Sequence, residues 1–133
     1  MKNDISDIII ENYSINGLSI GSPAQKIYEI MGEPDFPVGK LNKKSKLLYW
    51  SYGNITFLTE NNCIVAIDID LHSNKKEIVC LDKILNWKLE NWLTWAKKHE
   101  FCIQNVSDII KIVGSNIIFS LSQKGKLGMI SIR

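Results

Sequence analysis

The sequence predicts an α+β fold made of two pseudo-repeated units, each a helix packed on an antiparallel β-meander whose sheet is open on one face. Two amphipathic helical segments, each followed by several short strands, lead to this prediction. The 133 residues, 45% hydrophobic and 23% charged, are enough to fill one core. We therefore expect a single domain over residues 1–133, with sub-repeats at about 13–70 and 76–133.

The first helix is predicted to begin just after Ser22, which is a suitable N-cap. Pro23 fits the first helical position because its missing N–H costs nothing there. Apolar residues then recur at helical spacing, and Gly32 offers a left-handed C-cap. The residues expected on the buried face are Ala24, Ile27, Tyr28 and Met31.

The strands after this helix are predicted to form a meander. Gly53 and Asn54 favour a tight hairpin turn, which pairs Trp50 with Phe57 across the two strands. Since directly paired residues share a face, one face of the hairpin should be apolar and lie under the helix. The residues expected on it are Trp50, Tyr52, Ile55 and Phe57.

The next turn contains Asn61 and Asn62 and sets the register of the following strand. A two-residue turn would place Asp68 on the Phe57 side, and burying an unpaired carboxylate costs several kcal/mol. We therefore expect a loop of odd length, of about three residues, that keeps Ile67 on the Phe57 side.

The opposite face of this meander is expected to be the open one. Its residues are Tyr49, Thr56, Leu58, Glu60, Ala66, Asp68 and Asp70. Three of these are carboxylates beside an aromatic ring, a composition that suits recognition of a basic partner. The alternative is a solvated sheet face that carries acids for solubility.

A second helix is expected from about Trp87 to His99, with its own buried stripe of Leu89, Trp92, Leu93 and Ala96. The aligned positions of the two helices are Ala24 with Leu89, Ile27 with Trp92, Tyr28 with Leu93 and Met31 with Ala96. The strands align as well, with Phe57 on Phe119 and Ile67 on Ile130. Trp87 lies at the start of the helix, where it is either an exposed interface anchor or packed under a neighbouring loop.

Charge and motifs exclude several classes of site. The formal net charge is only +2 and Arg133 is the single arginine, so a dedicated nucleic-acid interface is not expected. We interpret the lysines at 40, 43, 44 and 46 as part of a solvated loop. The three cysteines form no C-x-x-C pair, and no phosphate-binding or nucleophile motif is present, so we expect no metal, no cofactor and no catalytic residues.

Two segments, Leu18–Asp35 and Trp50–Phe57, carry a recognisable signature of the form I-x-x-G-x-S/T, helix, L-G-x-P, W-x-Y-G, F. This resembles the small outer-membrane assembly lipoproteins (SmpA/OmlA-like). Tandem copies of a related unit occur in the β-lactamase inhibitor protein family, which presents a concave sheet face to its target. The same signature occurs in cytoplasmic immunity proteins of bacterial polymorphic and contact-dependent toxin systems.

The sequence departs from the lipoproteins, since neither a signal peptide nor a lipid-attachment cysteine lies near the N-terminus and no stretch is long enough to span a membrane. Met31 also replaces their usual leucine. The resemblance therefore implies a cytoplasmic immunity protein, or antitoxin. It is expected to neutralise a cognate bacterial toxin domain, a basic nuclease, by occlusion rather than by catalysis.

The residues expected to bind the toxin are Tyr49, Thr56, Leu58, Glu60, Asp68, Asp70 and Trp87. The free protein is expected to be a monomer, without direct contact to nucleic acid or membrane. Two alternatives remain open. One is a homodimeric scaffold or interaction domain that uses Trp87 or an open sheet edge. The other is a small-molecule-binding protein with a cavity between the two sheets.

Overall fold

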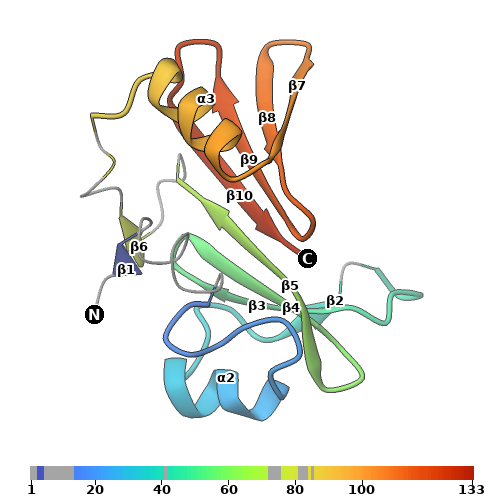
Figure 1. Cartoon of the computed structure of the whole chain (residues 1–133). Helices are drawn as coiled ribbons and strands as arrows, with labels where there is room; N and C mark the ends of the chain where they lie inside the picture. Colours follow the sequence, from blue (N-terminus) through green and yellow to red (C-terminus); the bar gives the residue numbers. More distant parts are fainter. Residues whose placement is uncertain (1–2, 5–13, 41, 72–75, 81–83, 85) are drawn as a thin grey trace.

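The computed structural model describes residues 3–4, 14–40, 42–71, 76–80, 84 and 86–133. Within this part, two helices and an eight-stranded antiparallel sheet confirm the α+β class (Figure 1). The helices are α2 (Ala24–Met31) and α3 (Leu89–Lys98). The strands are β1 (Asn3–Asp4), β2 (Gly39–Lys40), β3 (Leu48–Tyr52), β4 (Ile55–Glu60), β5 (Cys63–Asp70), β6 (Val79–Cys80), β7 (Cys102–Val106), β8 (Ile109–Val113), β9 (Ile117–Ser122) and β10 (Leu127–Ile132).

The large sheet runs continuously through both halves of the chain, in the order β2-β3-β4-β5-β10-β9-β8-β7. Its centre is the antiparallel pair of β5 and β10, in which Ile69 lies opposite Ile130. Strands β1 and β6 form a separate, short parallel pair. The meander strands of both halves therefore belong to one sheet rather than to two.

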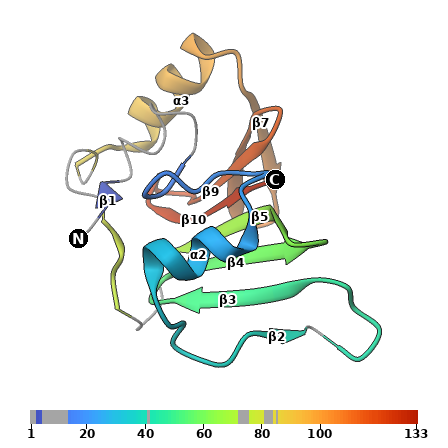
Figure 2. The same cartoon turned by 90° about the horizontal axis from the view of Figure 1, so that it is seen from below.

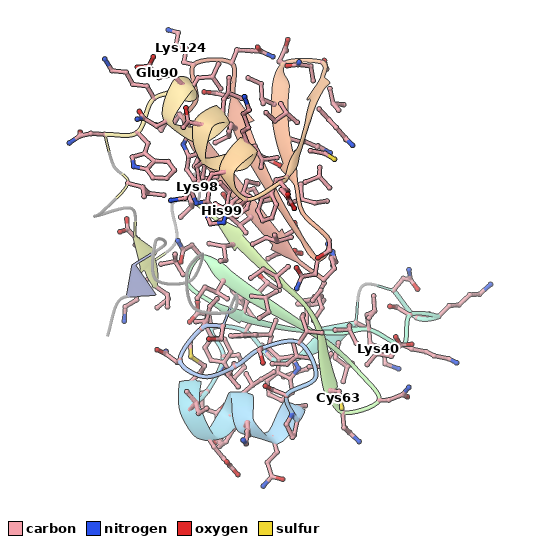
Figure 3. All side chains as sticks on the ribbon, in the orientation of Figure 1. Lys40, Cys63, Glu90, Lys98, His99 and Lys124 are labelled. Atoms are coloured by element: carbon pink, nitrogen blue, oxygen red, sulfur yellow. The ribbon has the colours of Figure 1, made fainter. Side chains whose placement is uncertain are left out.

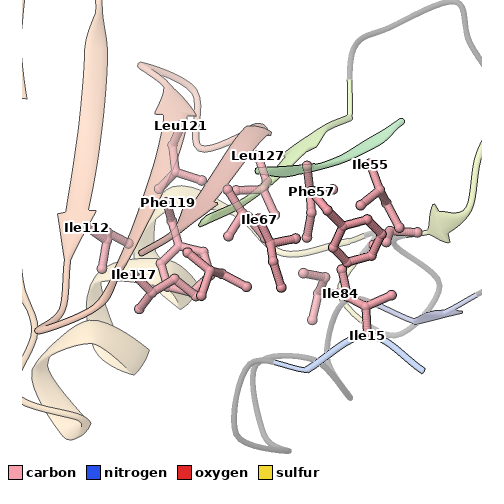
Figure 4. Packing of buried hydrophobic residues seen from close by; sticks show 14 of the residues in the cluster. Ile15, Ile55, Phe57, Ile67, Ile84, Ile112, Ile117, Phe119, Leu121 and Leu127 are labelled. Carbon is pink, nitrogen blue, oxygen red and sulfur yellow. The ribbon is translucent and has the colours of Figure 1, made fainter. Parts of the chain in front are cut away.

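Both helices pack on the same face of the sheet. Ile27 of α2 and Trp92 of α3 are fully or almost fully buried and belong to one continuous core. Phe57 and Phe119, which Figure 4 labels, are part of the same core. The ring centroids of Trp92 and Phe119 lie 5.8 Å apart. Helix α2 covers the β4 region of the sheet (Figure 2), and α3 covers the second half. No helix among the described residues covers the other face of the sheet.

Helix α2 begins at Ala24, one residue later than predicted. Pro23 occupies the N-cap position with an extended ψ of 141°, and the Ser22 hydroxyl instead accepts a hydrogen bond from the Ser19 N–H at 3.1 Å. At the other end, Gly32 has a φ of 78°, and its N–H donates to the Tyr28 carbonyl at 2.9 Å. Proline and glycine therefore mark the two ends of this helix, as their backbone preferences predict.

The buried face of α2 is narrower than predicted. Ala24 and Ile27 are buried and Met31 is half-buried, but Tyr28 is 50% exposed. The Tyr28 hydroxyl donates a hydrogen bond to the Glu33 carboxylate at 2.8 Å. The prediction of a buried Tyr28 is wrong because its polar end finds a partner at the surface instead.

The register of the first hairpin is confirmed. Trp50 lies opposite Phe57, and Tyr52 opposite Ile55, as expected from a two-residue turn at Gly53. Tyr52, Ile55 and Phe57 are buried and Trp50 is half-buried on the helix-covered face. The indole N–H of Trp50 donates to the Thr59 hydroxyl at 3.2 Å, which satisfies its polar atom.

The loop after β4 is shorter than predicted. Asn61 and Asn62 form a two-residue turn, with φ values of 52° and 64°, between the paired residues Glu60 and Cys63. Asparagine adopts such left-handed conformations at a lower cost than most residues. The prediction of a three-residue loop is therefore wrong.

A β-bulge corrects the register that this short turn would otherwise impose. The pairs on either side of the bulge are Leu58 with Ala66 and Thr59 with Ile64. Val65 is the extra residue, and beyond it Ile67 lies opposite Phe57, as expected. Asp68 consequently points away from the core, because the one-residue shift is absorbed inside the strand rather than in the turn.

Helix α3 is shorter at both ends than the range of about 87–99 predicted from its pattern. Trp92 and Ala96 are buried, whereas Leu89 and Leu93 are half-buried. Among the described residues, no helix has the length and apolar character needed to cross a membrane.

Candidate functional site: the open face of the sheet

The helix-free face of the sheet, here called the open face, contains a hollow of about 610 Å³. The residues that line it are Leu47, Tyr49, Ser51, Gly53, Asn54, Thr56, Leu58, Asp68, Asp70, Met129 and Arg133. Five of the seven residues predicted to bind a partner are among them. The structure thus brings together Tyr49, Thr56, Leu58, Asp68 and Asp70.

Strand pairing explains why these side chains share the hollow. Directly opposed residues of an antiparallel pair project to the same face. Thr56 lies opposite Ser51 on one side and Asp68 on the other, and Asp68 lies opposite Ser131 of the second half. One row of small polar and acidic side chains therefore crosses four neighbouring strands.

Tyr49 supplies the aromatic part of the open face. It is half-buried and pairs with Leu58 on one side and Gly39 on the other. A Cβ atom at Gly39 would meet the Tyr49 ring at 2.7 Å, so the ring lies directly over that glycine. This close cross-strand contact places the ring on the open face, against the backbone of β2.

Arg133 modifies the charge of the open face in a way that the sequence did not reveal. Its guanidinium lies 3.4 Å from Oδ1 of Asp68, forming an ion pair in which the arginine side chain is 55% exposed and the aspartate 32%. The same Oδ1 is buried and accepts no hydrogen bond in the described part of the chain. Asp68 is therefore partly neutralised from within the protein, through pairing of β5 with β10.

A second hollow, of about 370 Å³, adjoins the first. The residues lining it are Asp70, Asp108, Ile109, Ser120, Leu121, Ser122, Gly128 and Met129. Asp70 and Met129 belong to both hollows, so the open face continues across β10 and β9 into the second half. Met129 and Ile109 are 42% and 43% exposed and give this part apolar character, which the sequence analysis did not assign to the site.

The two remaining predicted residues do not line either hollow. Glu60 is half-buried at the far end of β4, opposite Cys63. Trp87 lies on the helix side, half-buried, with its ring centroid 4.7 Å from that of Trp92 in an edge-to-face arrangement. Of the two interpretations of Trp87, the packed one fits its position, since it contacts the core cluster.

The turn that borders the first hollow is held by hydrogen bonds to distant segments. The Gly53 N–H donates to the Asp35 carboxylate at 2.6 Å, and the Asp35 N–H donates to the Ser51 carbonyl at 2.8 Å. The Tyr52 hydroxyl donates to the Gly32 carbonyl at 2.8 Å. Residues of the recognisable signature thus contact one another and fix the hairpin to the segment after α2.

Burial, together with the smaller effect of the nearby carboxylates of Glu33 and Asp35, raises the pKa of Tyr52 to about 12. The ring is only 4% exposed, so the neutral phenol that donates to Gly32 is retained through the neutral pH range.

Asn54, the second residue of the turn, binds the segment that connects the two halves. Its side chain accepts hydrogen bonds from the N–H groups of Ile78 and Val79 at 2.9 and 3.2 Å. It also donates to the Val79 carbonyl at 3.1 Å. Because Asn54 is only 6% exposed, these bonds are shielded from water and hold the edge of the hollow in place.

Two thiols and the possible metal ligands can be located among the described side chains. Cys63 and Cys102 are free and exposed. No group of three or more His, Cys, Asp or Glu side chains is placed to hold a metal ion, within the ranges that the structure covers. The side chains that line the open face offer apolar contact area, hydrogen-bonding groups and charge.

Comparison with known proteins adds no relative. No family model matches the chain, and neither a curated protein nor a solved structure shows significant similarity to it.

Proposed function

We propose that this protein is a cytoplasmic immunity protein that binds a cognate bacterial toxin domain on its open face and neutralises it by occlusion, without catalysis. The observation that carries the proposal is the pair of adjoining hollows on the helix-free face of one continuous sheet. A macromolecular partner needs a broad surface of this kind, whereas a small-molecule site is usually more enclosed and more apolar.

Charge favours a basic partner such as a nuclease domain. The residues lining the two hollows include three carboxylates, Asp68, Asp70 and Asp108, and one guanidinium, Arg133. This local excess of negative charge stands out in a chain whose net charge is +2. Complementary charge at such a surface accelerates association and excludes like-charged competitors.

Apolar side chains on the open face supply contact area. Tyr49 and the buried Leu58 lie in the first hollow, while Met129 and Ile109 are exposed in or beside the second. An aromatic and apolar centre surrounded by polar residues is the usual composition of a specific interface. We infer that Tyr49 and Met129 make the central contacts.

We also infer that the two halves are copies of one unit. In the first half Phe57 pairs with Ile67, and in the second Phe119 pairs with Ile130. These are the positions that the sequence alignment matched, and all four side chains are fully buried. The arrangement supports the resemblance to inhibitors that present a sheet made of tandem units.

A survival assay tests the proposal. Candidate toxin domains, taken from the reading frames that flank this protein's gene, are expressed in bacteria with or without the protein. We expect survival only when the protein is present, together with co-purification of a complex of both chains. Cell death despite abundant folded protein would refute the proposal.

The binding face is tested separately by reversing its charge. The double variant Asp70→Lys, Asp108→Lys should bind more slowly at low salt, and its on-rate should depend less on ionic strength. The double variant Glu29→Lys, Glu90→Lys reverses two exposed carboxylates on the helices, is the control matched in charge, and should bind like the unmodified protein. An unchanged on-rate in the double variant would place the toxin elsewhere.

A further inference from the structure

The two edges of the large sheet differ in how they are protected. At one edge, β2 is only two residues long and carries Lys40 (Figure 3). Three further lysines, at 43, 44 and 46, follow it in the sequence. Short edge strands and lysines are devices by which proteins prevent edge-to-edge pairing. The β2 edge is therefore protected against pairing with a strand of another chain.

The opposite edge is formed by β7, and within the described ranges it carries no such protection. Its five residues, Cys102–Val106, are all exposed, and none is charged or a proline. Ile103 and Val106 are 43% and 46% exposed, although both are large and apolar. The strand pairs with β8 on one side, and β7 is the last strand in the sheet order (Figure 1). An uncharged edge with exposed apolar side chains is a template for another strand.

Strand geometry identifies which backbone groups face outward. The hairpin of β7 and β8 closes on the two-residue turn Ser107–Asp108, with Val106 opposite Ile109. The closing pair of such a hairpin is hydrogen-bonded, and the pattern then alternates along the strands. Gln104 and Cys102 thus bond to β8, whereas the N–H and C=O groups of Ile103 and Asn105 point to the free edge.

We propose that β7 pairs with β7 of a second copy of this chain, antiparallel and across a two-fold axis at Gln104. Ile103 then lies opposite Asn105 of the second copy, so each outward N–H meets an outward carbonyl. Gln104 lies opposite Gln104, and no charged residue of β7 opposes a like charge. The strand is thus complementary to itself, as an isologous dimer interface requires.

This dimer joins two eight-stranded sheets edge to edge and leaves the hollow beside Tyr49 at the far side of each sheet. It is independent of the proposed toxin binding and replaces the expectation of a monomer drawn from the sequence. The alternative is that a strand from a different protein pairs with this edge. Because β7 carries no charged residue, it offers no charge that would select such a partner.

The register of the dimer is tested by charges at its axis. Gln104→Lys and Gln104→Glu each place like charges opposite one another, which should raise the dimer dissociation constant about fivefold in sedimentation equilibrium. An equal mixture of the two variants should restore association as a heterodimer. Gln25→Lys, the same exchange at an exposed position of α2, is the control and should leave the dimer unchanged.

A second variant tests the backbone contacts. Asn105→Pro removes an outward N–H without removing a hydrogen bond to β8, and it should weaken the dimer by roughly tenfold to a hundredfold. Far-ultraviolet circular dichroism checks that each variant is folded. The proposal is overturned if the unmodified protein stays monomeric up to several hundred micromolar, or if its dimer is insensitive to both Gln104 charges and Asn105→Pro.

Discussion

Replacing Asn54 by alanine should destabilise the protein strongly, although the residue lies in a turn. Its side chain makes three hydrogen bonds, at 2.9, 3.2 and 3.1 Å, to the backbone of Ile78 and Val79. The residue is 6% exposed and Val79 is fully buried, so water cannot replace these bonds without local opening. Each bond contributes about 1 kcal/mol, and each backbone group left unpaired costs about 1–3 kcal/mol.

We therefore expect Asn54→Ala to lower the free energy of unfolding by about 3 kcal/mol, measured by urea denaturation followed by tryptophan fluorescence. Asn42→Ala is the matched control, because the exposed Asn42 side chain accepts one local hydrogen bond, from Lys44. It should change stability by less than about 0.5 kcal/mol. If Asn54→Ala cost no more than Asn42→Ala, the connecting segment would not be held by these bonds.

Three further predictions concern pH, backbone shape and charge. The folded pKa of Tyr52 is about 12, above the unfolded value of 10.0, so its stabilising effect is complete below pH 10 and is lost as the pH rises towards 12. Tyr52→Phe should cost about 1 kcal/mol at neutral pH, and urea titrations should show this deficit shrinking above pH 10. Gly125→Ala should lower the melting temperature by several degrees, because Gly125 has a φ of 89° and a Cβ atom would lie 2.6 Å from Cα of Leu89. Arg133→Ala frees Asp68 of its 3.4 Å ion pair, so stopped-flow mixing with a basic toxin domain should show faster association at low salt; slower association would contradict the proposed role of the acidic side chains.

Local chemistry explains the parts of the fold that could be predicted from the sequence. The turn at Gly53 determines which residues of β3 and β4 oppose one another, and proline and glycine mark the ends of α2. These features depend on residues close together in the chain, where backbone preferences act directly. Five of the seven predicted partner-binding residues share one hollow because their alternation along β3, β4 and β5 follows from the same register.

Features that depend on distant pairing could not be predicted. Nothing local indicates that β5 pairs with β10, so the continuity of the sheet and the ion pair of Asp68 with Arg133 were missed. The bulge at Val65 was missed because a register can be corrected either in a turn or within a strand. Tyr28 was assigned to the core because helical periodicity cannot tell a buried ring from one whose hydroxyl bonds at the surface.

The pairing of β5 with β10 has a consequence for how the chain folds. Until β5 and β10 pair, each of them is an unprotected sheet edge. Almost the whole second half of the chain separates Ile69 from its partner Ile130. Closing so long a loop costs conformational entropy before the hydrogen bonds between the two strands can form, and this cost slows folding. We expect neither half to remain monomeric when expressed alone, since its bare central strand would invite aggregation, and we expect the intact chain to fold and unfold as one cooperative unit.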